Sequence, residues 1–508
     1  MKKDNRRIAN NTIILYIRMI VVMFIGLFTS RIILNRLGVI DFGIFNVIAG
    51  LVMIMGFVNQ ALTCATQRYI TFNLAQNKKD ISNKIFNLSL FLHITIAIVV
   101  LIIGESVGQF FLQTMMVIPS EKINVASIVL LLSLFVSFIS ISLVPFNAEI
   151  IAHEDLRFYA FISIFETFLK LVCVLSLYLF EDNRLIVYST LILLNQSIVA
   201  IIIIYYCKRR YEEVFIKISK DLTLYKEIFA FSFWSLIGDL AWTLTIHGTN
   251  VLLNLFFNPA VNAARGIAVQ VQGAVSGLAN NLNMAINPQI TKNYSINDLQ
   301  RVHNLLLVSS KLSFFLILIP SLPIYFEASF ILELWLGVVP EHTVNFVKLT
   351  LILVLIESIG SPFNASIFAT GRVKYYQLTI GCCNLLNIPI AYCVFKYFKQ
   401  EPELVYVIVA TTTFINQMFK LFYIKKYLEL RLYSFIKAVY VPCVSVFIIC
   451  FLLFSNIHDK SFFNNSFANI IINIACTFFI VFFIGLKSQE KKMLLALIKK
   501  KILFIYNS

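Results

Sequence analysis

Charged side chains are scarce in this chain. Asp, Glu, Lys and Arg together make up 13% of its 508 residues, whereas apolar residues make up 59%. Soluble domains usually carry about 25% charged residues. A soluble chain of this length also divides into several domains joined by polar linkers, and no such linker is present. The composition therefore excludes a soluble multidomain protein.

Several motifs that carry chemistry are also missing. The nine cysteines form no Cys-x-x-Cys pair and have no spacing suited to zinc or to a disulfide framework, and the six histidines are scattered. No Walker motif indicates an ATP site. No long loop with hydrolase or Asp-x-Asp signatures is present, which counts against a membrane glycosyltransferase or polymerase. We expect no metal and no resident cofactor.

What the chain has instead is a succession of apolar stretches of roughly 20 residues, each long enough to cross a bilayer as a helix. About fourteen such spans are predicted, centred near residues 23, 53, 96, 135, 169, 196, 240, 274, 314, 356, 385, 413, 444 and 475. The eighth, residues 263–286, is rich in Gln and Asn, so it should face protein or water. The expected fold class is an all-α polytopic membrane protein.

Basic residues concentrate in every second connection between the predicted spans. About 29 of the 42 Lys and Arg residues fall on one side and about 6 on the other. This bias places both termini, with the connections that contain Lys78, Arg209 and Lys426, in the cytoplasm. The net charge of +16 is then explained by anionic membrane lipids as partners, and no nucleic acid is expected.

An internal repeat divides the chain. Residues 144–152 (Val-Pro-Phe-Asn-Ala-Glu-Ile-Ile-Ala) recur as residues 361–369 (Ser-Pro-Phe-Asn-Ala-Ser-Ile-Phe-Ala), and residues 33–35 recur as 252–254. The shared offset of about 217 residues corresponds to six spans, so both copies enter the membrane in the same direction. The repeat predicts a lobe of six helices at 1–210, a cytoplasmic linker at 211–225, a second lobe at 226–427, and two additional helices with a basic tail at 428–508. A duplicated unit in such an apolar chain indicates a transporter with a site between the lobes.

Charges inside predicted spans are the best candidates for functional residues, because each is costly unless it faces a partner or water. The basic ones are Arg18, Arg31, Lys170, Arg265 and Lys311, which are candidates for binding an anionic substrate. The acidic ones are Glu166, Asp239 and Glu357, which are candidates for ion coupling. An excess of fixed positive charge suits phosphate, and the planar fork of arginine binds it through two hydrogen bonds.

Each candidate has a structural alternative. Glu166 and Lys170 are spaced to form an ion pair on one helix turn, and Asp239 is a candidate partner for Arg18. Arg31 could anchor the helix at the membrane interface. Lys311, like Lys420 at an inner span end, could extend its side chain toward the headgroups.

Longer stretches of the sequence resemble a known family. Residues 252–268 (Leu-Leu-Asn-Leu-Phe-Phe-Asn-Pro-Ala-Val-Asn-Ala-Ala-Arg-Gly-Ile-Ala), residues 287–292 (Asn-Pro-Gln-Ile-Thr-Lys), the Arg-x4-Arg-Leu-Gly-x3-Phe-Gly pattern from Arg31 to Gly43, and Leu-Trp-Leu-Gly at 334–337 resemble the Wzx-type polysaccharide flippases of the MATE-like (MOP) superfamily. The resemblance covers nearly the whole chain. It implies two six-helix lobes in a V shape, alternating access, and a location in the bacterial cytoplasmic (inner) membrane.

The resemblance also implies a substrate, an undecaprenyl-diphosphate-linked oligosaccharide moved to the outer leaflet for O-antigen or capsule synthesis. Polysaccharide polymerase and glycosyltransferases would be partners. Lipid II flippases of the same superfamily use arginines in the first, second and eighth helices, and Arg18, Arg31 and Arg265 stand at comparable places. The driving force would be a Na⁺ or H⁺ gradient or the membrane potential, which supplies about 4–5 kcal/mol for two charges across roughly 100 mV.

A cation-coupled multidrug exporter of the MATE type is the main alternative on the same fold. Drug-exporting members usually carry an acidic residue in the first helix, where this chain has Arg18. The fold alone does not separate the two functions.

Overall fold

In the computed structural model, every regular element of the described residues is helical. The structure describes residues 2–55, 57–114, 120–215, 222–257, 259–336, 339–398, 401–459, 466–487 and 490–491. The predicted all-α class is therefore confirmed. Two compact units share the chain: one comprises Ile13–Asp239, and the other comprises Met1–Thr12 with Leu240–Ser508.

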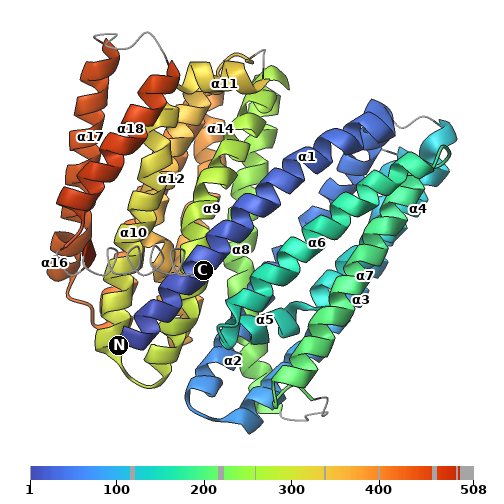
Figure 1. Cartoon of the computed structure of the whole chain (residues 1–508), viewed down its shortest axis with the longest axis horizontal. Coiled ribbons are helices and arrows are strands. Elements are labelled where there is room, and N and C mark those ends of the chain that lie inside the picture. Colours follow the sequence, from blue (N-terminus) through green and yellow to red (C-terminus); the bar gives the residue numbers. More distant parts are fainter. Residues whose placement is uncertain are drawn as a thin grey trace, which may run out of the picture. The chain divides into compact units, whose positions relative to one another are not determined.

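The unit of residues 13–239, called the N-terminal unit below, contains most of α1 and the beginning of α8. Its helices are α1 (Lys2–Met55), α2 (Phe57–Ala75), α3 (Lys79–Thr114), α4 (Ile123–Ser142), α5 (Val144–Ala152), α6 (Leu156–Ser176), α7 (Arg184–Arg210) and α8 (Leu222–Phe256), with short 3₁₀ turns at Ser120–Lys122 and Leu177–Leu179. Within this unit α2 packs on α3 and α5, α4 packs on α3 and α7, and α6 packs on α7 (Figure 1).

The unit that contains residues 240–508, called the C-terminal unit below, holds the remaining helices. They are α9 (Pro259–Ser295), α10 (Leu299–Phe326), α11 (Ala328–Leu336), α12 (Thr343–Thr370), α13 (Lys374–Leu385), α14 (Asn387–Phe398), α15 (Leu404–Leu428), α16 (Leu432–Phe435), α17 (Val441–Asp459) and α18 (Ser466–Ile480), with π-helical turns at Ile436–Tyr440 and Val481–Gly485. Here α9 packs on α10 and α12, α12 packs on α10 and α15, and α13 and α14 pack on α15. Helices α17 and α18 lie against α10 (Figure 1).

The two units share an order of neighbours. The contacts of α2, α3, α4–α5, α6 and α7 in the N-terminal unit are matched by those of α9, α10, α12, α13–α14 and α15 in the C-terminal unit. A duplication produces such a pattern. The unit boundaries fall within α1 and α8, so the lobe limits 1–210 and 226–427, the linker 211–225 and the addition 428–508 stay a prediction.

The two repeated prolines have different local structures. Leu143 separates α4 from α5 just before Pro145, whereas Pro362 lies inside the continuous helix α12. Proline lacks a backbone N–H and crowds the preceding turn, so it is accommodated most easily near a helix start. Pro145 occupies such a place at the start of α5.

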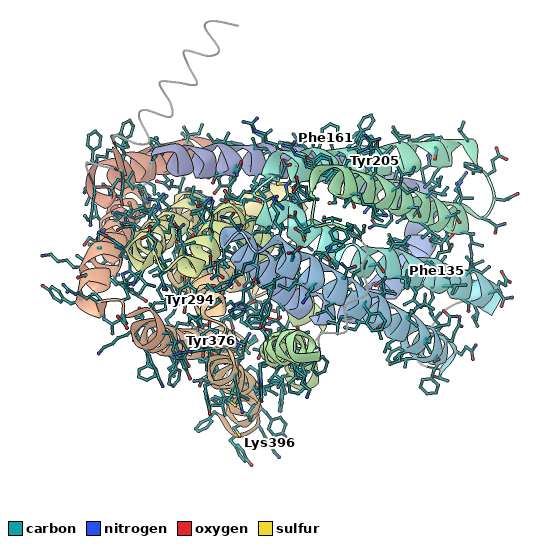
Figure 2. All side chains as sticks on the ribbon, turned by 90° about the horizontal axis from the view of Figure 1, so that it is seen from below. Phe135, Phe161, Tyr205, Tyr294, Tyr376 and Lys396 are labelled. Carbon is teal, nitrogen blue, oxygen red and sulfur yellow. The ribbon has the colours of Figure 1, made fainter. Side chains whose placement is uncertain are left out.

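The chain is a multi-pass membrane protein. Among the described residues, ten helices are long and apolar enough to cross a membrane. They begin at Lys79, Ile123, Leu156, Arg184, Leu299, Thr343, Lys374, Leu404, Leu432 and Ser466. The spans predicted near residues 23 and 53 both lie in α1, which is helical over 54 residues, and those near 240 and 274 lie in α8 and α9. Large apolar side chains point outward, among them Phe161 and Tyr205 (Figure 2). The orientation of the termini stays a prediction.

Candidate functional site

A polar stripe follows one face of α6 in the N-terminal unit. Tyr159, Ser163, Glu166 and Lys170 are spaced so that they share this face. Arg18 of α1 reaches it: its Nη1 donates a hydrogen bond to Ser163 Oγ at 3.4 Å, and its guanidinium carbon lies 5.2 Å from the centroid of the Tyr159 ring. The structure therefore places three predicted site residues, Arg18, Glu166 and Lys170, along one helix face.

Glu166 and Lys170 interact through their charges. No ion pair within 4 Å joins them in the part of the chain that the structure describes, and both side chains are exposed. Asn195 of α7 donates a hydrogen bond from Nδ2 to the backbone oxygen of Glu166 at 3.3 Å, which fixes this turn of α6. The acid and the base are thus available to a ligand on this face.

The remaining candidates of the N-terminal unit are less well defined. Asp239 lies on α8, where its charge acts on Cys64 of α2. Its expected pairing with Arg18 stays a prediction. Arg31 lies in α1, but its side chain is outside the described residues.

Helix α9 presents an open polar face in the C-terminal unit. Gly266, Gln270, Gly273 and Asn280 share one side of this helix, and all four are exposed. Apart from the backbone of α9 itself, no atom of the described residues lies within 4 Å of the position that a Cβ would take at Gly266 or Gly273. Exposed amides beside glycines suit water or a polar ligand better than lipid. Asn281 and Asn283 point instead into the unit, where Asn283 Nδ2 donates to Ser361 Oγ at 2.8 Å.

Arg265 lies next to this face but is turned inward. Its side chain is 7% exposed, and its guanidinium carbon lies 5.5 Å from the centroid of the Tyr406 ring on α15. The tyrosine ring stabilises the buried cation through its π electrons. Arg265 therefore joins α9 to α15 inside the C-terminal unit.

Lys311 of α10 is buried at 2% exposure and has a dedicated partner. Its Nζ lies 2.5 Å from Glu490 Oε2, and the same oxygen accepts a hydrogen bond from the Lys487 backbone N–H at 2.7 Å. The positive charge of Lys311 is therefore balanced by the segment that follows α18. Neither the pair nor its position follows from helix periodicity.

Glu357 of α12 faces a base that we expected to point toward the headgroups. Its charge interacts with that of Lys420 on α15. One turn away, Gln417 donates from Nε2 to the backbone oxygen of Ile356 at 3.1 Å. Gly360 leaves room for this amide, because a Cβ there would overlap Gln417 Oε1. Polar interactions thus join α12 to α15 inside the C-terminal unit.

One cluster of side chains in the N-terminal unit was not predicted from the sequence. Glu149, His153 and Glu213 bring an imidazole nitrogen and two carboxylates together in the N-terminal unit. The only local signal is the spacing of four residues between Glu149 and His153; Glu213 comes from the segment after α7, far along the chain.

Comparison with solved structures identifies the architecture. The chain has the fold of the MOP superfamily transporters. A MATE protein carrying a single substitution matches with a TM-score of 0.75 at 14% identity, over 84% of this chain and 96% of that one. A MOP superfamily transporter from Pyrococcus furiosus, described as having a binding pocket of reverse polarity that suggests a different function, matches with a TM-score of 0.73 at 14% identity and the same coverage. So does an outward-facing multidrug resistance MATE family transporter.

These likenesses establish the fold alone, because the sequences are so different. No protein-family model and no curated protein matches the sequence.

Proposed function

We propose that this protein is a flippase that moves an undecaprenyl-diphosphate-linked oligosaccharide from the cytoplasmic to the outer leaflet of the bacterial inner membrane. The observation that carries the proposal is the embedded positive charge: each unit of this MOP-type fold holds an arginine within its helices, Arg18 against α6 and Arg265 against α15. Arginine keeps its proton in any such surrounding and prefers phosphate.

In the N-terminal unit, Arg18, Arg31 and Lys170 are the candidates for binding phosphate. In the C-terminal unit, the exposed amides of Gln270 and Asn280 on α9 are the candidates for binding sugar hydroxyls. Arg265 is the phosphate candidate of that unit, and it binds only when it turns from Tyr406 toward the α9 face. Lys311 contributes only when Glu490 leaves it, because the ion pair otherwise neutralises its charge. The polyprenyl tail stays in lipid while the polar head follows the open face of α9.

Direction comes from the membrane potential, which favours outward movement of two negative charges by about 4–5 kcal/mol at roughly 100 mV. Glu166, Asp239 and Glu357 are the acids that would couple transport to Na⁺ or H⁺. The polymerase and glycosyltransferases of the same polysaccharide are the expected partners.

A steric block of the α9 face tests the proposal. Gly273→Phe adds a ring in open space, so the protein should fold while transport of a labelled lipid-linked oligosaccharide in proteoliposomes falls at least tenfold. Gly26→Phe on α1 is a matched control, since its Cβ position is equally open and its exposed neighbours Met23, Phe24 and Phe28 are apolar. Full transport by Gly273→Phe at normal abundance would remove the α9 face from the site.

Arg265 gives a second test. Arg265→Ala should abolish complementation of a flippase-null strain, and Arg265→Lys should restore it only in part, because an ammonium keeps the charge and loses the fork. Membrane abundance is measured alongside, since Arg265 also packs on Tyr406. If complementation falls only in proportion to the amount of protein in the membrane, Arg265 contributes to stability and not to substrate binding.

A cation-coupled multidrug exporter is the second candidate, favoured by the structural likeness to a multidrug resistance MATE transporter and by the acids Glu166 and Asp239. Export of a cationic dye from cells separates the two. Dye export that depends on these acids, without transport of the lipid-linked oligosaccharide, would support the exporter and overturn the flippase.

A further inference from the structure

A compact group of three metal-binding side chains lies in the N-terminal unit, away from the polar stripe of α6. Glu149 is in the last turn of α5, His153 follows that helix, and Glu213 lies just beyond α7. One donor atom from each residue lies within 4.8 Å of the other two. His153 Nε2 contacts Glu213 Oε1 and lies 3.7 Å from Glu149 Oε2.

Glu149 shows that the group is incomplete without a further ligand. Its side chain is fully buried, and neither carboxylate oxygen has a hydrogen-bond partner among the described residues. A buried carboxylate without donors is strongly unfavourable. A second carboxylate, Glu213, lies close by and is itself 2% exposed. Two buried acids that share one imidazole leave a negative charge uncompensated, which either a proton or a bound cation can neutralise.

The surrounding residues hold these donors in place. The His153 ring stacks on the Tyr211 ring with centroids 4.2 Å apart. Asn83 of α3 donates from Nδ2 to the backbone oxygen of Glu213 at 2.5 Å and to that of Phe215 at 2.9 Å. A ring orientation fixed by stacking and a backbone fixed by side-chain amides are the outer-shell features that support metal ligands.

We propose that Glu149, His153 and Glu213 form a binding site for a divalent transition-metal cation of the Zn²⁺ type. One imidazole nitrogen and two carboxylate oxygens make a ligand set that suits Zn²⁺, while Mg²⁺ and Ca²⁺ prefer oxygen alone. Donors bound to Zn²⁺ at about 2.0–2.2 Å need only small side-chain movements here: Glu213 moves away from His153, and Glu149 moves closer. Water completes the coordination.

By binding Glu213 together with Glu149 and His153, the cation would cross-link the segment of residues 211–215 to the end of α5. The contacts that already hold this segment include the hydrogen bonds from Asn83 and Asn87 to its backbone, the ion pair of Lys79 with Glu212, and the stacking of Tyr211 on His153. This role is independent of the substrate that the protein carries.

Metal binding to the full-length protein in detergent tests the proposal. After treatment with a chelator and its removal, the protein should bind about one Zn²⁺ per chain by calorimetry and elemental analysis, and Zn²⁺ should raise the midpoint of thermal unfolding, whereas Mg²⁺ should not. Glu149→Gln keeps the shape of the side chain and should weaken Zn²⁺ binding at least tenfold, as should His153→Ala.

The chain offers a matched control. His342 and Glu403 form a similar histidine–carboxylate pair with Nδ1 and Oε1 2.7 Å apart, but the pair belongs to no three-ligand cluster among the described residues. His342→Ala should leave Zn²⁺ binding unchanged. Size-exclusion profiles show which variants are folded. One folded variant, either Glu149→Gln or His153→Ala, is enough to test the site. Wild-type protein that binds no Zn²⁺, or a folded Glu149→Gln or His153→Ala protein that binds Zn²⁺ like wild type, would overturn the site.

Discussion

At the scale of single residues, two buried cations of this protein, Lys311 and Arg265, have particular partners. Charges within the predicted spans could be found from the sequence because they interrupt apolar runs. Their partners could not. Glu490, which balances Lys311, lies 179 residues further along the chain, and Tyr406 carries no charge that would mark it as the neighbour of Arg265.

The ion pair of Lys311 and Glu490 yields a first prediction. Glu490→Gln leaves the Lys311 ammonium buried without its counter-charge, which should lower the free energy of unfolding by about 3 kcal/mol. Lys311→Met combined with Glu490→Gln should recover most of that loss, because no buried charge remains. Thermal unfolding of the single and double variants in detergent measures both effects. Equal stability of Glu490→Gln and wild type would show that the pair contributes nothing.

Glu403 yields a prediction about pH. Burial raises its pKa, but the hydrogen bonds from His342 and Asn345 outweigh burial, so the pKa lies below the ordinary value of 4.5. A carboxyl whose pKa is lowered by folding stabilises the protein above its unfolded pKa, and this contribution is lost as pH falls through the folded pKa. Glu403→Gln should therefore lower the free energy of unfolding near pH 7 by an amount on the order of 1 kcal/mol.

The difference between Glu403→Gln and wild type should then shrink as the pH falls below 4.5. Unfolding midpoints measured over a pH series in one detergent check this. Glu401→Gln, at the same end of α15, is a suitable control. A difference that grows on acidification would contradict the assignment.

At the scale of helices, the apolar runs predicted the elements well and their junctions less well. Pro145 and Pro362 are equivalent positions of the repeat, yet only Leu143 before Pro145 separates two helices, while α12 continues through Pro362. Helix contacts also depend on interactions that no periodicity displays. Nothing in the sequence distinguishes Gly360 from other small residues of the predicted spans. In the structure, its missing side chain leaves the space that the Gln417 amide occupies between α12 and α15.

Gly360→Ala provides the test at this scale. The new Cβ would overlap Gln417 Oε1, so the amide must move and its hydrogen bond to Ile356 is disturbed. The expected cost is about 1–3 kcal/mol. Gly266→Ala, where the added methyl group meets no neighbouring side chain within 4 Å, should not destabilise the protein, because alanine favours a helix over glycine. Thermal unfolding of the two variants decides, and equal midpoints would mean that Gln417 moves away at no cost.

At the scale of the whole molecule, the composition was sufficient to predict an all-α membrane protein. The internal repeat predicted that the chain contains two similar units. Long apolar helices follow from the scarcity of charge, and the two units have the same order of helix neighbours. The assignment of residues to units was harder to predict, because α1 and α8 each belong to both. A helix that continues across a boundary leaves no polar linker in the sequence.

The orientation in the membrane is testable directly. The basic bias predicts that position 80 is cytoplasmic and position 459 is external. In a variant without native cysteines, an impermeant thiol reagent added to whole cells should label Asp459→Cys and spare Asp80→Cys. Permeabilised cells should expose both positions, which controls for reactivity. Labelling of position 80 alone would reverse the orientation.

The distance along the chain between Lys311 and Glu490 has a consequence for biosynthesis. A ribosome adding about 5–20 residues per second completes Glu490 roughly 10–35 s after Lys311. During that interval α10 must enter the bilayer with an ammonium whose partner does not yet exist, at a cost of about 2.5–3.5 kcal/mol near the membrane centre. Until Glu490 is present, only the favourable transfer of the apolar side chains of α10 into the bilayer offsets this free-energy cost. The segment that contains Glu490 therefore neutralises the Lys311 ammonium only after α10 has entered the membrane.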